Sequence, residues 1–153
     1  MKTYKARRIK IKSVCELERS VKNKVYKKGT CYMQMSAVSG TRQIWHLLDC
    51  DSHVTPGKYM MFLPKEGTTY DGEYLYIMLE KEVPDFIKRY CTTMNIQKEA
   101  FDHLSILWIT DDAERREYVM LMHMQKACID QEKKLIESVR MFKKVMMSLM
   151  FPS

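Results

Sequence analysis

From Asp111 to Phe151 the sequence contains neither glycine nor proline. An uninterrupted segment of about 40 residues predicts one continuous helix of roughly 60 Å, because each helical residue adds about 1.5 Å. Asp111, followed three residues later by Glu114, resembles a capping box that begins this helix. The sequence therefore predicts a globular domain over 1–110 and the long helix over 111–153.

The predicted helix carries an apolar stripe that repeats every seven residues from Tyr118 to Leu149. Gln125 and Glu132 are its two polar interruptions, of the kind that fix register at some cost in stability. An isolated helix would expose this stripe to water, so we expect it to pair with a helix from a second copy or from a partner protein. The predicted pairing residues are Tyr118, Leu121, Met122, Cys128, Ile129, Leu135, Ile136, Val139, Phe142, Met146, Leu149 and Met150.

The first 110 residues alternate between strand-like and turn-like segments. Apolar alternation or β-prone composition predicts strands over 8–14, 30–36, 43–48, 59–63 and 105–109, while the polar segment 15–24 is expected to be a loop or short helix. Helical spacing predicts a helix over Tyr74–Lys81, a second one over Asp85–Tyr90 after Pro84, and a third over Gln97–His103 capped by Asn95. The predicted fold class is α+β: a small, mainly antiparallel β-rich domain with short helices, followed by one long C-terminal coiled-coil helix.

Positive charge is concentrated at the N-terminal end. The chain has a net charge of +7, yet residues 1–28 carry eleven Lys or Arg against Glu16 and Glu18, so that the remainder sums to −2. A local excess of cations is typical of a surface that binds a polyanion, although it can also be a solvated edge. The candidate phosphate contacts are Arg19, Lys22, Lys24, Lys27 and Lys28.

Known catalytic patterns are absent from the sequence: it has no glycine-rich phosphate loop, no Gly-x-Ser-x-Gly and no His-Glu-x-x-His. The five cysteines form no Cys-x-x-Cys pair, which favours reduced, buried thiols. His46, Cys50 and His53 fall short of the four ligands of a structural zinc site, so we expect a buried Cys50 and no metal. The sequence thus favours a non-catalytic binding protein that needs no cofactor.

Candidate base-reading residues lie near a predicted break in the β-rich domain. Arg42 and Gln43 directly follow Ser39-Gly40-Thr41. Arg can hold guanine and Gln can hold adenine by paired hydrogen bonds in the major groove. The candidate base contacts are Ser39, Thr41, Arg42 and Gln43.

Several strings, in their order along the chain, resemble the specificity (S) subunits of type I restriction–modification systems. The helix end matches best, with Ile129-Asp130-Gln131-Glu132-Lys133-Lys134-Leu135-Ile136-Glu137 leading to Phe142-Lys143-Lys144 and a terminal Leu149-Met150-Phe151-Pro152. Upstream, the segments 26–33, 73–79 and 92–106 resemble successive parts of a target-recognition domain. Thr110-Asp111-Asp112 stands where the family usually has a proline-rich turn, and only one, short recognition domain is present.

The resemblance implies a DNA sequence-recognition subunit in which long helices pair antiparallel as a spacer. A half-sized subunit of this kind would dimerise, or pair with another S-type chain, and read two symmetric half-sites on double-stranded DNA. It would present the DNA to a methyltransferase (M) subunit and to a translocating restriction (R) subunit, which use S-adenosylmethionine and ATP.

Two other functions stay open from the sequence. The chain could be a helical assembly protein whose basic segment only aids solubility, or a regulator that occupies a methyltransferase subunit without reading DNA. No signal peptide and no apolar segment of 18 residues is present, so we expect a cytoplasmic protein without membrane contact.

Overall fold

The computed structural model describes residues 3–36, 43–91 and 93–151 and confirms the α+β fold class. The chain divides into two compact units, 1–116 and 117–153, which we describe separately. In chain order the elements are β1 (Ala6–Lys10), η1 (Ile11–Ser13), β2 (Cys15–Arg19), β3 (Val25–Tyr26), β4 (Cys31–Gln34), β5 (Trp45–Leu47), β6 (Ser52–His53), β7 (Tyr59–Pro64), α1 (Gly72–Tyr90), η2 (Lys98–His103), β8 (Ser105–Ile109) and α2 (Asp112–Met150).

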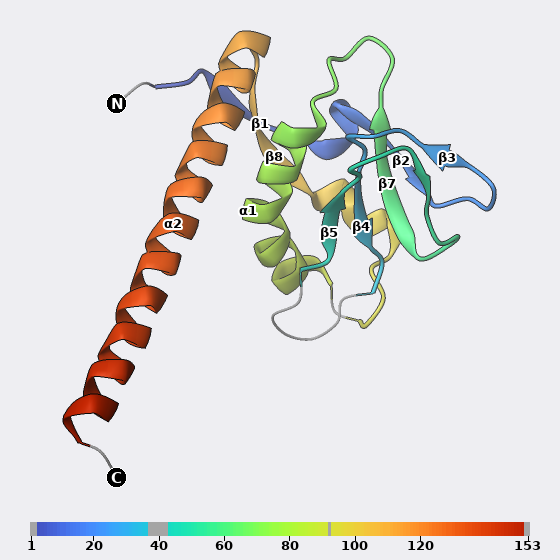
Figure 1. Cartoon of the computed structure of the whole chain (residues 1–153). Helices are drawn as coiled ribbons and strands as arrows, with labels where there is room; N and C mark the ends of the chain where they lie inside the picture. Colours follow the sequence, from blue (N-terminus) through green and yellow to red (C-terminus); the bar gives the residue numbers. More distant parts are fainter. Residues whose placement is uncertain (1–2, 37–42, 92, 152–153) are drawn as a thin grey trace. The chain divides into compact units, whose positions relative to one another are not determined.

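The main sheet of the first unit is antiparallel, with strand order β2-β7-β4-β5 (Figure 1). Its most apolar strand, β7, lies between two neighbours, and Met60, Met61 and Phe62 are fully buried. A central strand covered on both faces needs consecutive apolar residues, which explains the sequence Tyr-Met-Met-Phe-Leu. The predicted strands over 30–36, 43–48 and 59–63 are confirmed as β4, β5 and β7.

The predicted strand over 8–14 is wrong in its second half. β1 ends at Lys10, and a 3₁₀ turn follows in which Val14 N–H donates to Ile11 O at 3.1 Å. Ile11 is fully buried, and its own N–H donates to Leu104 O. The turn moves the chain from the two-stranded β1-β8 sheet to the main sheet, so the slip in alternation at Val14 marks a corner between two strands.

The expectation of a loop or short helix over 15–24 is also wrong at its start, because Cys15–Arg19 forms β2. This strand lies at the edge of the main sheet and pairs only with β7. An edge strand can carry charged residues outward, while Cys15 is buried and Leu17 is half-buried. The polar composition of these residues therefore did not indicate a strand.

A single helix, α1, replaces the two helices expected around Pro84. The Asp71 carboxylate caps it by accepting from Tyr74 N–H at 3.0 Å. Val83 and Phe86, on either side of Pro84, are both buried, so both halves of the helix pack on the same core. This packing outweighs the roughly 3 kcal/mol that an interior proline costs.

Beyond α1, the helix expected over Gln97–His103 is a 3₁₀ helix, η2, and it has no side-chain cap. Asn95 forms an isolated β-bridge with Ser36 in place of the expected cap. The returning strand over 105–109 is confirmed as β8, which pairs antiparallel with β1. α1 packs against both β5 and β8, and Tyr74 O–H donates to Leu107 O at 2.8 Å.

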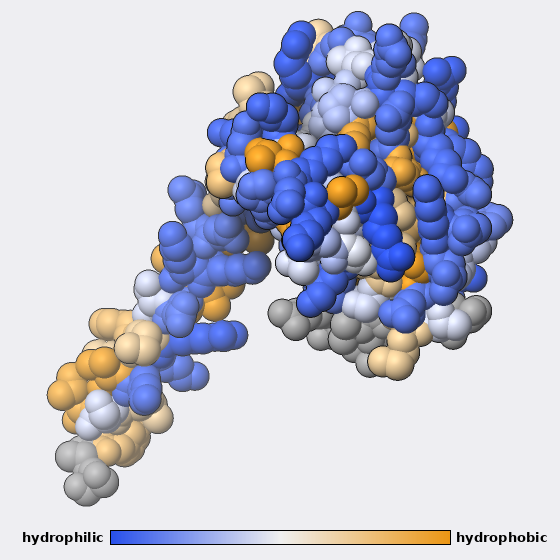
Figure 2. Space-filling model, turned by 90° about the vertical axis from the view of Figure 1, so that its right-hand side faces the viewer, coloured by the Kyte–Doolittle hydropathy of each residue, from blue (hydrophilic) through white to orange (hydrophobic). Residues whose placement is uncertain are grey.

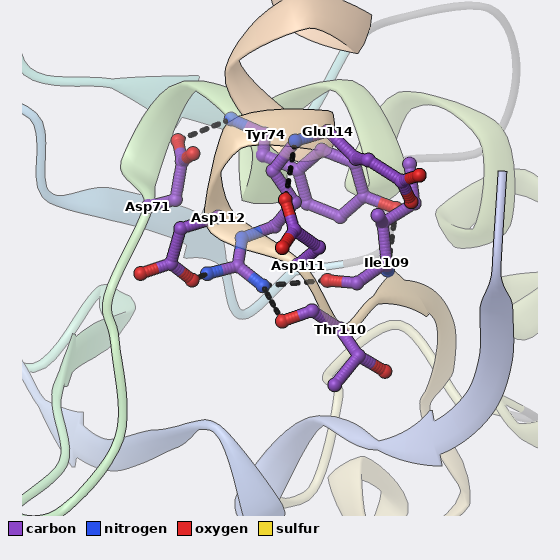
Figure 3. A network of polar contacts seen from close by, with 8 residues as sticks. Asp71, Tyr74, Ile109, Thr110, Asp111, Asp112 and Glu114 are labelled. Carbon is purple, nitrogen blue, oxygen red and sulfur yellow. Dashed lines mark hydrogen bonds and ion pairs between the residues drawn. The ribbon is translucent and has the colours of Figure 1, made fainter.

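The connection from β8 to α2 is held by a network of polar contacts (Figure 3). Glu114 N–H donates to the Asp111 carboxylate at 2.9 Å, so the expected cap is present. The guanidinium of Arg115 is almost fully buried; it donates to the carbonyl oxygens of Ile109 and Thr110 and pairs with Asp112. It also lies 4.7 Å from the ring centre of Trp108. These contacts fix the first turn of α2 to the end of β8.

The second unit is the greater part of α2, a helix of 39 residues. Among the predicted pairing residues, Tyr118 and Met122 are half-buried and the other ten are exposed. Leu135, Phe142 and Leu149 expose 65%, 67% and 71% of their surface. Apolar side chains gather on the part of the helix nearest its C-terminal end (Figure 2).

Candidate nucleic-acid interface

At one end of its strands, the main sheet brings four strand ends side by side. We call this end the sheet edge, as distinct from the edge strand β2. Because neighbouring strands run antiparallel, Arg19 at the end of β2 lies beside the start of β7, where it pairs with Met60. Gln34 at the end of β4 pairs with Tyr59, and Trp45 begins β5 at the same edge. Side chains from distant parts of the sequence are therefore collected here.

A further segment, between α1 and η2, joins this edge (Figure 1, yellow). Asn95 bridges Ser36, and Ile96 N–H donates to Met35 O at 2.6 Å. The Ile96 side chain is buried, with 2% of its surface exposed. These contacts anchor the segment, so that the exposed Asn95 and Gln97 side chains are held near the end of β4.

Together these segments surround a hollow of about 620 Å³, which we call the sheet-edge groove. Its polar lining comprises cations, amides, hydroxyls and one acid: Arg19, Lys58, Lys98, Gln34, Asn95, Gln97, Ser36, Tyr59 and Glu99. Three cations against one carboxylate give the lining a positive balance. Guanidinium and amide groups in such a setting can hydrogen-bond to the edges of nucleic-acid bases or to phosphates.

Two of the groove side chains are oriented by hydrogen bonds. Arg19 Nε–H donates to the carbonyl of Gly57 at 2.9 Å, which leaves its two terminal nitrogens directed elsewhere. Gln34 Nε2 donates to Ser36 Oγ at 2.6 Å, which leaves its carbonyl oxygen as an acceptor.

The cations that the sequence assigned to phosphates are exposed, but two of them are paired. Lys24 Nζ lies 2.6 Å from a Glu18 carboxylate oxygen, and this hydrogen bond raises the Lys24 pKa. Lys27 Nζ lies 3.1 Å from Asp51. The pKa of Asp51 is lowered, first by the backbone N–H of Lys28 and then by Lys27. Within the described residues, no ion pair engages Lys22 or Lys28.

The predicted phosphate contacts do not form one compact patch. Arg19 ends β2 and lines the sheet-edge groove. Lys27 and Lys28 precede β4, so they lie toward the end of that strand opposite to Gln34. Their assignment to phosphates stays a prediction.

Of the predicted base contacts, Ser39, Thr41 and Arg42 lie outside the described residues. Gln43 is described, and its Nε2 donates to the Trp45 carbonyl at 2.9 Å and to the Tyr76 hydroxyl of α1 at 2.8 Å. Both amide hydrogens are thus engaged by the protein. Base reading by Gln43 would require these two bonds to be exchanged.

Sequence reasoning missed most of the sheet-edge groove. Gln34 lies within a strand, and Asn95, Gln97 and Lys58 lie in segments with no motif. Backbone contacts between distant segments bring these residues together, including the bridge between Ser36 and Asn95 and the hydrogen bond from Met35 N–H to Lys58 O. The one available signal was the pair of amides Asn95 and Gln97 at the start of the helix predicted over Gln97–His103.

The expectation of a buried Cys50 is wrong, because its side chain is exposed. Cys15 and Cys31 are buried as expected, and all five cysteines are free. No group of three or more His, Cys, Asp or Glu side chains suited to a metal occurs within the parts of the chain that the structure describes. Among those same residues, no helix is long and apolar enough to cross a membrane.

No protein-family profile matches the chain, and no curated protein matches it in sequence. Solved structures similar to the chain in fold include two S subunits. The S subunit of the type I restriction–modification system from M. genitalium aligns with a TM-score of 0.60 at 12% identity, over 97% of this chain and 46% of that one. The HsdS subunit from Thermoanaerobacter tengcongensis aligns with a TM-score of 0.57 at 13% identity, over 83% of this chain and 39% of that one.

The chain thus spans less than half of each of these subunits. The match includes both the β-rich unit and the long C-terminal helix, which agrees with the resemblance seen in the sequence strings. The fold of this chain is that of a type I restriction–modification S subunit, over about half of that subunit's length.

Proposed function

We propose that the chain recognises a DNA sequence for a type I restriction–modification system, without catalysing a reaction itself. The observation that carries this proposal is the structural match to S subunits over 97% of the chain. In this role it presents double-stranded DNA to a methyltransferase subunit and a restriction subunit, whose S-adenosylmethionine and ATP it does not need to bind.

Helix pairing through α2 is the second part of the proposal. Ten exposed apolar positions along a single helix would be costly to leave in water, so a second helix is needed to cover them. We infer that the partner helix runs antiparallel and comes from a second copy or from another S-type chain.

The charge distribution along the helix supports the antiparallel direction. Residues 111–117 carry Asp111, Asp112, Glu114 and Glu117 against two arginines, while 140–144 carry Arg140, Lys143 and Lys144 without an acid. The same asymmetry stabilises each helix through its dipole. In an antiparallel pair the acidic start of one helix lies beside the basic end of the other, whereas a parallel pair would place like charges together.

A two-fold pair of this kind would read a symmetric DNA site with two half-sites. The test is selection from a randomised duplex pool by the full chain, alone and together with a methyltransferase subunit. We expect enrichment of two inverted copies of a short motif, with an affinity that falls as salt rises. Failure to enrich any motif in either form would overturn the proposal.

One observation favours the alternative of an assembly or regulatory protein that does not read DNA. Lys24 and Lys27 are neutralised by Glu18 and Asp51, which weakens the basic segment as a polyanion-binding surface. That alternative predicts an affinity for DNA that is weak and independent of sequence, and it predicts helix pairing all the same.

A further inference from the structure

We propose that the sheet-edge groove reads base edges in the major groove, with Arg19 as its guanine-reading side chain. The amides of Gln34, Asn95 and Gln97 are the neighbouring readers. The inference rests on the proposed function, because it names the residues through which that function would recognise DNA. It moves Arg19 from the phosphate contacts, where the sequence places it, to the bases.

Arg19 is held differently from Arg8, Lys24 and Lys27. Arg8 makes two bonds of 2.9 and 3.0 Å to Glu82, and Lys24 and Lys27 also pair with acids. Within the described residues, no carboxylate pairs with Arg19, whose Nε–H is bonded to a backbone carbonyl. The protein thus orients the guanidinium plane and leaves the two terminal nitrogens available.

This arrangement suits a base better than a phosphate. Guanine presents O6 and N7 side by side in the major groove, and two parallel N–H donors of one guanidinium match them. A phosphate can also accept the two donors of a guanidinium, but it requires only positive charge, which a lysine on a flexible stem supplies as well. Lys58 and Lys98, both exposed at the groove, fit the phosphate role.

The amides complete the reading surface. An amide carries an acceptor and a donor next to each other, which is the pattern that adenine N6 and N7 require. Gln34 retains its carbonyl oxygen, and no hydrogen bond of the Gln97 side chain occurs within the described part of the chain. Asn95 and Gln97 are exposed but belong to a segment anchored by the buried Ile96, so their backbone positions are fixed.

The experiment compares variants of the full chain in selection and in salt titration of DNA binding. Arg19→Lys keeps the charge and removes the paired donors. We expect it to lose the guanine preference at one position of each half-site, to bind the wild-type motif roughly 5- to 150-fold more weakly, and to keep the wild-type salt dependence.

Lys22→Ala is the contrasting variant, since Lys22 is an exposed cation outside the groove. We expect it to weaken binding to all sequences alike and to reduce the slope of log affinity against log salt by about 1. Gln97→Ala, which removes an exposed amide, should relax the motif at a different position from Arg19→Lys.

Two results overturn the inference while leaving the proposed function intact. One is a wild-type motif that Arg19→Lys and Gln97→Ala both leave unchanged. The other is that Arg19→Ala weakens binding to every DNA sequence equally and lowers the slope of log affinity against log salt. Such behaviour is that of a phosphate contact. If the wild-type chain enriches no motif at all, the proposed function itself fails and this inference fails with it.

Discussion

Arg115 is a charged side chain with only 2% of its surface exposed, and its hydrogen bonds join the end of β8 to the first turn of α2. Arg115→Met would keep the bulk of the side chain but leave the carbonyls of Ile109 and Thr110 without their donor. We expect the free energy of unfolding to fall by about 2–3 kcal/mol. Urea unfolding followed by tryptophan fluorescence measures this, since Trp108 lies against the guanidinium.

The matched control is Arg116→Met, at an exposed position one residue along the same helix. We expect a change of less than about 0.5 kcal/mol there. Equal effects of the two substitutions would mean that the buried contacts of Arg115 contribute nothing to stability.

The buried thiols predict a loss of stability at alkaline pH. Burial raises the pKa of Cys15 from 9.0 to about 12 and raises that of Cys31 as well. Between pH 9 and 12 the unfolded chain releases thiol protons that the folded chain retains, so the free energy of unfolding decreases as pH rises, by up to about 1.4 kcal/mol per pH unit for each thiol.

Urea unfolding at pH 8, 9 and 10 tests this expectation. Cys15→Ala removes one titrating group and should make the decline shallower than in the wild-type chain. Cys50→Ala, which removes an exposed thiol, is the matched control for the substitution. The explanation is wrong if Cys15→Ala declines as steeply as the wild type.

Periodicity in the sequence could not identify Arg115 or the groove amides. A charged residue near the start of an amphipathic helix is normally solvated, and nothing local marks Arg115 as buried. The groove depends on which strands are neighbours, a property of the whole sheet. Sequence reasoning therefore selected Ser39, Thr41, Arg42 and Gln43 as base contacts and did not identify the groove.

At the scale of elements, the strands and helices with a regular apolar pattern were predicted most accurately from the sequence. β7 and α2 carry continuous or periodic apolar patterns and were identified correctly. β2 was missed because it is an edge strand, with a neighbouring strand on one side, and its sequence is mostly charged. α1 was divided at Pro84 because the local cost of proline is visible in the sequence, whereas the packing of Val83 and Phe86 that outweighs it is not.

The pairing of α2 gives a prediction at this scale. Leu135→Gln combined with Phe142→Gln places two polar amides in the proposed seam, where each would lose its hydration on pairing. We expect the dissociation constant of the dimer to rise by at least about tenfold, which corresponds to roughly 1.4 kcal/mol. Light scattering over a range of protein concentrations measures it.

Met141→Gln is the control for this pair, since Met141 is 59% exposed but lies outside the seven-residue stripe. It should pair as the wild type does. Dimerisation that survives the double substitution would contradict the proposed seam.

At the scale of the whole molecule, the order of several degenerate strings suggested a fold that the structural match bears out. Individual strings were too short and too degenerate to identify residues for the proposed DNA contact. The fold was thus predictable from the sequence, while the candidate site needed the three-dimensional arrangement.

If α2 sets the distance between two recognition units, its length should set the spacing of half-sites. Deleting residues 126–132 removes one seven-residue repeat and keeps the seam in phase. The two units would move closer by about 10 Å in total, which shortens the separation of half-sites by roughly 3 base pairs. Selection with the deletion variant measures the spacing.

Removing only residues 126 and 127 is the control, because two residues correspond to about 200° of helical rotation and their loss takes the two halves of the seam out of phase. That variant should lose pairing and with it the symmetric motif. A spacing that stays unchanged after the seven-residue deletion would mean that α2 does not set it.

The C-terminal end of the exposed stripe of α2 contains two methionines, Met146 and Met150. Methionine is unbranched and adapts its shape to different neighbours. A seam made in this way tolerates partners whose packing surfaces are not identical to its own. We expect such chains to exchange partners with related chains, so that a small set of recognition units would generate a larger repertoire of composite DNA targets.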